Sequence, residues 1–166
     1  VGQLGDHHVC ITFDDALRCQ FDIATPVLQR HGLTAFWFVY TSVMEGGCER
    51  LEIFRQFRTR RFAPAEDFHA AFFAEVASSD DGQRVRDALR HFDPDDYLAD
   101  FPFYSTSDRR FRYVRDKVLG QTAYERVVER MIQKSGESVD ELARNLWMDD
   151  ACVRDLDAEG HVVGLH

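Results

Sequence analysis

The sequence predicts an α/β protein in which short parallel strands are buried and a long helical segment is inserted between them. Runs of apolar and β-branched residues lie near both ends of the 166-residue chain, each next to a segment of helical periodicity. Between these runs, residues 45–146 show helical spacing alone. Because a chain of this length usually folds as one domain, we expect a single domain over residues 1–166 with a helical insertion over residues 45–146.

The first strand–helix–strand unit is expected near the N-terminus. Residues 9–13 are apolar and partly β-branched, which predicts a buried strand. Apolar side chains then recur at helical spacing over residues 22–31, with Pro26 in or near the first turn and Gly32 as a left-handed C-terminal cap. Residues 34–40 follow as a second strand that is apolar on both faces, which is typical of a buried parallel sheet.

The insertion is expected to consist of helices in succession, because apolar residues repeat there at helical spacing. Two segments begin with the pattern of a capping box, in which a Ser or Thr and a Glu three residues later bond each other's backbone N–H groups. These pairs are Thr122 with Glu125 and Ser138 with Glu141. They predict a helix start at each of the two positions.

The α/β pattern returns after the insertion. Asp149 or Asp150 is expected to cap a helix that Gly160 ends. Residues 161–165 then predict a third strand. Because this apolar strand stops at His166, we expect the sequence to be a piece of a longer chain.

Composition and charge argue against some classes of partner. The chain has 20 basic and 29 acidic residues, for a formal net charge of -9. A negative field of this size disfavours nonspecific binding to nucleic acid and to anionic membranes. The apolar runs also stay well below the roughly 18 residues of a membrane span. We expect no nucleic-acid partner and no membrane span, and the oligomeric state stays unknown.

The four cysteines bear on the compartment. They form no C-x-x-C pair, so neither a zinc ribbon nor a thioredoxin-like motif is expected. We expect buried free thiols, with Cys10 in the first strand and Cys152 on a helix face. Free thiols favour a reducing compartment, so the localisation, otherwise unknown, leans towards the cytoplasm.

Acidic and imidazole side chains follow two of the predicted strands. Asp14 and Asp15 come directly after the first strand, and His166 follows the third. Since the carboxyl ends of parallel strands meet at one edge, we expect these three residues to converge. Carboxylate oxygen and imidazole nitrogen together suit Zn²⁺ or a similar ion, and a second carboxylate can serve as general base. Spacing alone leaves open a helix cap, a loop carboxylate and a structural histidine.

Three segments share their pattern and their order with one enzyme family. They are residues 11–16 (Ile-Thr-Phe-Asp-Asp-Ala), residues 31–39 (His-Gly-Leu-Thr-Ala-Phe-Trp-Phe-Val) and residues 159–166 (Glu-Gly-His-Val-Val-Gly-Leu-His). They resemble the Thr-Phe-Asp-Asp-Gly motif, the second strand and the start of the second motif of polysaccharide deacetylases, the NodB-homology group or carbohydrate esterase family four. One departure is Ala16, which stands where glycine is usual. If that position needs a positive φ, alanine costs on the order of 1 kcal/mol.

The resemblance implies a fold and a role for each site residue. The fold would be a partial distorted (β/α) barrel with the large helical insertion, and the chain a single truncated catalytic domain. Asp14 matches the catalytic base, Asp15 the first metal ligand and His166 the first histidine ligand. The metal would be Zn²⁺, with Co²⁺ or Mn²⁺ as alternatives.

The same resemblance implies the reaction. It is metal-dependent hydrolysis of N-acetyl groups from a bacterial polysaccharide or glycan precursor, so the partner is an N-acetylated glycan substrate. The family's second ligand histidine and its catalytic acid would follow His166. The 166-residue chain by itself is therefore expected to be inactive or nearly so.

Other functions remain open. An α/β phosphatase-like hydrolase also uses acids after its first strand, although it needs Asp-x-Asp spacing and here the two acids are adjacent. A Mg²⁺-binding receiver module would place an aspartate where His166 stands. A catalytically incomplete deacetylase would act as a glycan-binding or scaffolding module.

The remaining histidines and the arginine clusters are assigned to structural roles. His7 and His8 precede the first strand and are expected in an exposed turn. His69 and His91 fall in the insertion, where a surface or interface position is expected. A solvated helix face, or the steering of an anionic glycan or a nucleotide-sugar-like group, is expected of Arg58, Arg60, Arg61, Arg109, Arg110 and Arg112.

Overall fold

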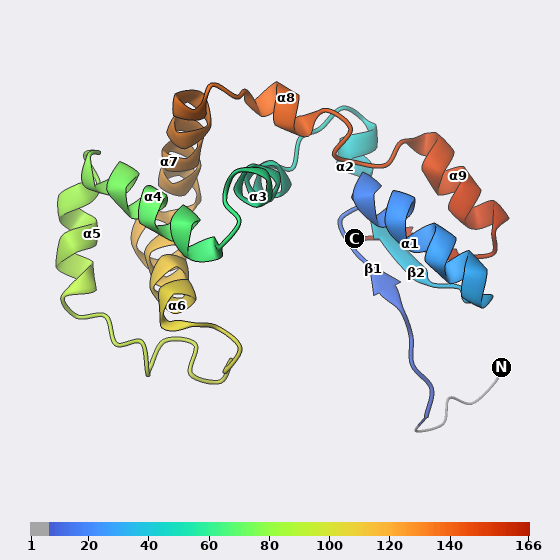
Figure 1. The fold of residues 1–166 in the computed structure, drawn as a ribbon, viewed down its shortest axis with the longest axis horizontal. Coiled ribbons are helices and arrows are strands. Elements are labelled where there is room, and N and C mark those ends of the chain that lie inside the picture. The colour runs from blue at the N-terminus through green and yellow to red at the C-terminus, as the bar shows by residue number, and fades with distance from the viewer. Residues whose placement is uncertain (1–6) are drawn as a thin grey trace. The chain divides into compact units, whose positions relative to one another are not determined.

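The computed structural model describes residues 7–166, which form two compact units (Figure 1). One unit joins the two ends of the described chain, up to Glu49 and from Ala143 onward, and is termed the sheet unit. The other covers Arg50–Leu142 and is termed the helical unit. The predicted single truncated catalytic domain with an insertion over residues 45–146 stays a prediction.

The predicted partial distorted (β/α) barrel is wrong. Of residues 7–166, 59% are in helices and 8% in strands, and the strands described there form a small three-stranded parallel sheet. The strands are β1 (Thr12–Phe13), β2 (Phe36–Val39) and β3 (Val162–Leu165). A closed barrel of this type needs about eight strands. Most of the chain instead buries its apolar side chains between helices.

The sheet has the order β1-β2-β3, with β2 in the centre. Phe13 pairs with Trp37 on one side of β2, and Val39 pairs with Leu165 on the other. Because all pairings are parallel, the three strands end at one edge, which we term the carboxyl edge. The residues that leave the strands at this edge are Asp14, Asp15, Tyr40 and His166.

Two helices cover the sheet, α1 (Arg18–His31) and α9 (Asp150–Ala158). They meet it in one apolar cluster in which Trp37 is 1% exposed and stacks on Phe13 with a centroid distance of 4.2 Å. The other buried members of this cluster are Leu28, Ala35, Met148, Cys152 and Leu156. A short helix, α2 (Thr41–Met44), follows β2.

Helix α1 starts earlier than expected. Its C-terminal cap is confirmed, because Gly32 has a φ of 63°. The helix begins at Arg18, whose N–H donates to the carbonyl of Leu146, so the placement of Pro26 in or near the first turn is wrong. Pro26 lies inside the helix and removes the N–H that would bond the carbonyl of Asp22.

The helical unit has its own core. Phe68 and Phe72 are 1% and 0% exposed, and their rings contact those of Phe111 and Tyr124. The elements are α3 (Arg50–Arg61), α4 (Ala65–Ala77), α5 (Gly82–Leu89), α6 (Thr106–Tyr113), the π-helical η1 (Val114–Leu119), α7 (Gly120–Ser135) and α8 (Val139–Ala143), the last of which ends in the sheet unit.

The capping predictions have mixed outcomes. Ser138 and Glu141 do cap the start of α8, since the N–H of Ser138 donates to Glu141 Oε2 at 3.0 Å and the reverse bond is 3.2 Å. Asp149 is confirmed as the cap of α9. The capping box at Thr122 and Glu125 is wrong, because η1 continues into α7 and the helix starts before Thr122. A capping box that the sequence analysis missed starts α6, from Ser105 to Asp108.

Burial also differs from the expectation for cysteine and histidine. Cys10, Cys19 and Cys48 are exposed and only Cys152 is buried, so the buried-thiol prediction is wrong for three of the four. Cys10 precedes β1 and belongs to the exposed segment of residues 7–10. The surface or interface position predicted for His69 is also wrong, because its side chain is buried.

His69 is 3% exposed and belongs to the core of the helical unit. Its ring stacks on Phe111 at 4.7 Å, and Nδ1 lies 2.8 Å from Ser107 Oγ. Burial lowers the pKa of His69, and the carboxylate of Asp108 acts in the opposite direction. Its neighbours from α6 explain the burial, which the spacing within α4 does not reveal.

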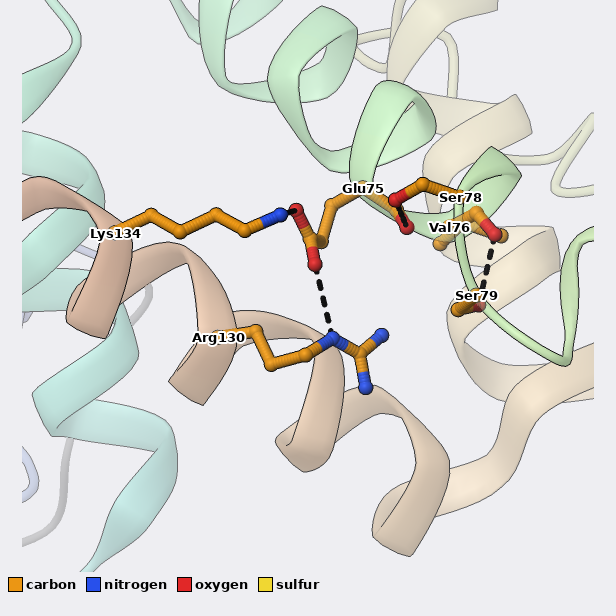
Figure 2. Close-up of polar contacts among 6 residues, drawn as sticks. All are labelled: Glu75, Val76, Ser78, Ser79, Arg130 and Lys134. Atoms are coloured by element: carbon orange, nitrogen blue, oxygen red, sulfur yellow. Dashed lines mark hydrogen bonds and ion pairs between the residues drawn. The ribbon is translucent and has the colours of Figure 1, made fainter.

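A buried carboxylate joins α4 to α7 in the helical unit (Figure 2). Glu75 accepts from Arg130 Nε at 2.9 Å and from Lys134 Nζ at 2.6 Å. The hydrogen bond from Lys134 is the main reason why the pKa of Glu75 is lowered. Burial acts in the opposite direction and by itself would raise this pKa. Two serines cap carbonyl groups at the C-terminal end of α4. Ser78 Oγ donates to the carbonyl of Glu75, and Ser79 Oγ donates to the carbonyl of Val76.

No helix within residues 7–166 combines the length and the apolar character needed to cross a bilayer.

Candidate functional site

Three side chains meet at the carboxyl edge, one from the end of each strand. His166 Nε2 lies 3.9 Å from Asp15 Oδ1. The hydroxyl of Tyr40 donates to the same Asp15 oxygen at 2.6 Å. The ring of Tyr40 also packs edge-on against the imidazole of His166, with a centroid distance of 4.8 Å and an interplanar angle of 82°. The group is thus a carboxylate, a phenol and an imidazole in mutual contact.

The register of the sheet places two of these residues side by side. The pairing of Val39 with Leu165 puts Tyr40 and His166 at equivalent positions after their strands. The N–H of His166 donates to the carbonyl of Val39 at 3.0 Å, which continues the ladder past β3. The backbone of His166 is therefore held at the sheet although its side chain is 38% exposed.

A tight turn after β1 brings Asp15 to the same place. Asp15 and Ala16 have φ angles of 74° and 52°, both in the left-handed region. Aspartate tolerates this region well, whereas alanine does not. Glycine would adopt this conformation without strain, whereas Ala16 carries a strain of about 1–2 kcal/mol.

The turn is anchored by a segment from the far end of the sequence. The carbonyl of Ala16 accepts from the N–H of Met148 at 2.8 Å, and Leu17 forms an antiparallel bridge with Trp147. Ala16 is 1% exposed, so its methyl group is enclosed. These contacts fix the turn that orients Asp15.

The structure brings together two of the three predicted site residues. Asp15 and His166 lie within reach of one ion, and the Asp15 side chain is 20% exposed. Asp14 leaves β1 at the same edge but is exposed, and within the described chain no hydrogen bond or ion pair links it to Asp15 or His166. The three roles assigned by resemblance stay predictions.

The donor set fits part of a zinc site. With Zn–O and Zn–N distances of about 2.1 Å, two ligand atoms on one ion are about 3.4 Å apart at a tetrahedral angle and at most about 4.2 Å apart. The 3.9 Å between Asp15 Oδ1 and His166 Nε2 lies within this range and is too long for a hydrogen bond. Among residues 7–166, however, no group of three or more His, Cys, Asp or Glu side chains could hold a metal ion. A catalytic zinc usually has three protein ligands.

Tyr40 is the site residue that the sequence analysis missed. It was counted as the last residue of the second strand, whereas β2 ends at Val39. The signal was present, because Tyr40 follows a strand end just as Asp14 and His166 do. A polar residue directly after a predicted strand is therefore the sequence signal for this site.

Three further histidines of the sheet unit do not join the site. His7 and His8 are exposed ahead of β1, in agreement with the expectation. His161 precedes β3, at the opposite edge of the sheet, and is 6% exposed. Its Nδ1 accepts from the N–H of Ala35 at 3.0 Å, which gives it a structural role at the start of the β2–β3 pairing.

A scan against protein-family models, a search of curated proteins and a search of solved structures each return no match. The residues of the carboxyl edge are therefore the basis for a functional assignment.

Proposed function

We propose that the carboxyl edge supplies part of the metal site of an N-deacetylase that acts on a polysaccharide or glycan precursor. The 3.9 Å separation of Asp15 Oδ1 and His166 Nε2 is the observation that carries this proposal. These two residues are among the three site positions that resemble the deacetylase motifs. Their oxygen and nitrogen donor atoms suit Zn²⁺, with Co²⁺ or Mn²⁺ as alternatives.

Tyr40 would hold the two ligands in place. Its hydroxyl bonds Asp15 Oδ1, and its ring packs against His166. Hydrogen bonds of this kind fix the orientation of metal ligands, and their loss typically costs about 10- to 100-fold in metal affinity.

Asp14 would act as the general base. Its exposed carboxylate at the same edge can accept the proton of the attacking water. A bound cation would polarise the acetamide carbonyl and lower the pKa of that water. The water oxygen adds to the carbonyl carbon, the C–N bond breaks, and the leaving nitrogen takes up a proton. The products are acetate and a free amino sugar.

The reaction needs a third metal ligand and an acid for the leaving amine, beyond the side chains at this edge. With two protein ligands, metal binding by the 166-residue chain is expected to be weak, and its hydrolytic activity low. Metal affinity therefore tests the ligand assignment before activity does.

The first test is titration with Co²⁺ followed by visible absorption, with Zn²⁺ as competitor. Asp15→Asn and His166→Ala should each abolish the Co²⁺ spectrum, because each removes a ligand. Asp14→Asn is the matched control, since it removes the adjacent carboxylate and should leave affinity unchanged. Equal affinity in wild type, Asp15→Asn and His166→Ala would contradict the proposed ligands.

The second test measures acetate that the full-length protein releases from an N-acetylated glycan. Asp14→Asn should lose activity while it keeps the metal. Wild-type-like activity in this variant would end the assignment of Asp14 as base. Glycan binding without acetate release would support a glycan-binding or scaffolding module instead.

A further inference from the structure

A small cavity in the helical unit is lined by four arginines. Its volume is about 150 Å³, and its lining includes Arg55 and Arg58 of α3, Arg112 of α6 and Arg115 of η1. Aromatic side chains, among them Tyr124, line the rest of the wall. In a chain with a net charge of -9, this is a local concentration of positive charge.

Two of the four guanidinium groups have carboxylate partners and two do not. Arg55 pairs with Glu52, and Arg115 binds both oxygens of Asp116, at 2.5 and 3.0 Å. Arg58 and Arg112 form no ion pair within the part of the chain that the structure describes; Arg112 lies over the ring of Tyr104. Four positive charges against two negative ones leave a charge of +2 at the cavity.

The positive charges of these arginines act on the same two buried side chains, Tyr124 and His69. Burial raises the pKa of Tyr124, and the positive charges of Arg115, Arg58 and Arg55 act against this rise. Arg58 and Arg112 also act on the buried imidazole of His69. The cationic groups from α3 and from the α6–η1 segment therefore converge in space. A π-helical turn such as η1 is itself frequent at functional sites.

We propose that this cavity binds the phosphoryl group of an anionic ligand. Guanidinium groups match phosphate oxygens with paired hydrogen bonds. A phosphate monoester carries about -1.5 to -2 charges near neutral pH, which balances the +2 of the cavity, whereas a carboxylate leaves one charge unmatched. A cavity of 150 Å³ holds a group about the size of benzene, so the phosphoryl group enters and the remainder of the ligand stays outside. The site is in the helical unit and does not depend on the deacetylase proposal.

The test is isothermal titration of the 166-residue chain with inorganic phosphate and phenyl phosphate. Ionic strength is held constant with chloride, and EDTA excludes a contribution from bound metal. Arg58→Gln and Arg112→Gln should weaken binding about tenfold or more, because each removes a guanidinium that has no carboxylate partner. Arg60→Gln and Arg61→Gln are matched controls, since both are exposed on α3 outside the cavity lining and should bind like wild type.

Several results would overturn the proposal. Phosphate that binds no better than chloride at equal ionic strength rules out the site. Acetate that binds as well as phosphate rules out the phosphoryl selectivity. Equal losses in Arg60→Gln and Arg58→Gln mean nonspecific screening. If circular dichroism shows that Arg58→Gln does not fold, Arg58→Lys is tested in its place. A phosphate affinity of Arg58→Lys equal to that of wild type would then exclude the bidentate contact.

Discussion

The hydroxyl of Tyr40 donates a 2.6 Å hydrogen bond to Asp15, and this bond joins the residue after the central strand to the turn after β1. The same tyrosine ring packs against His166. One side chain thus contacts both proposed ligands.

Replacing Tyr40 with Phe should lower the Co²⁺ affinity of the chain by about tenfold, because the Asp15 carboxylate loses its orienting bond while the ring contact with His166 remains. Co²⁺ titration measures the effect. Tyr113→Phe, a change of the same chemistry in the helical unit, should leave the affinity unchanged. Identical affinities for Tyr40→Phe and wild type would show that the bond does not position the ligand.

Substitutions at Ala16 should separate backbone strain from packing. Ala16→Gly relieves about 1–2 kcal/mol of left-handed strain but loses about 0.8 kcal/mol of methyl burial and about 0.4–1 kcal/mol through the unfolded state, so the net change is near zero. Ala16→Val adds a β-branched side chain at positive φ in an enclosed position, and should destabilise by at least about 2 kcal/mol.

Urea unfolding followed by tryptophan fluorescence tests both changes at Ala16. The two tryptophans of the chain, Trp37 and Trp147, both lie in the sheet unit, so the signal reports this unit. Similar stabilities for the valine variant and wild type would mean that the turn relaxes without cost.

Pro26→Ala should stabilise the sheet unit. Pro26 is exposed inside α1, where alanine would restore the N–H that bonds the carbonyl of Asp22. Proline in a helix interior lowers the stability of the folded state by about 3 kcal/mol relative to alanine. Because proline also restricts the unfolded chain, about 0.4–1 kcal/mol of this loss is offset. We expect a gain of about 1–3 kcal/mol in the fluorescence-detected unfolding free energy. A loss of stability would show that the chain needs proline at this position.

Glu75 should make the helical unit sensitive to acid. Its pKa is lowered in the folded state by Lys134 and Arg130, so its stabilising effect is complete above the unfolded value of about 4.3 and is lost as the pH falls through the lower folded value. Glu75→Gln should cost about 1–3 kcal/mol at pH 7 and much less near pH 3.

Far-UV circular dichroism during urea unfolding at pH 7 and at pH 3 measures the effect of Glu75→Gln. Asp80→Asn, at an exposed acid in the turn after α4, should change neither value. A loss from Glu75→Gln that is equally large at both pH values would mean that its charge is not what stabilises the unit.

Features that depend on a few neighbouring residues were readable from the sequence. The Gly32 cap, the Asp149 cap and the Ser138–Glu141 box each close hydrogen bonds within about four residues, so local spacing is enough to predict them. The central parts of the second and third predicted strands also became β2 and β3, because runs of aromatic and β-branched residues favour an extended backbone.

Features that depend on partners far along the chain were not readable. The start of α1 is set by the bridge between Leu17 and Trp147, and the burial of His69 by Phe111 and its neighbours. Sequence spacing placed Asp15 and His166 near one edge, but the 3.9 Å between them arises from two left-handed residues and the register of β3 on β2. Long-range packing also decided against a barrel, because a helical unit with its own core leaves few residues for strands. Local hydrogen bonding is encoded within a few residues, whereas burial, register and strand number depend on contacts that only the folded chain creates.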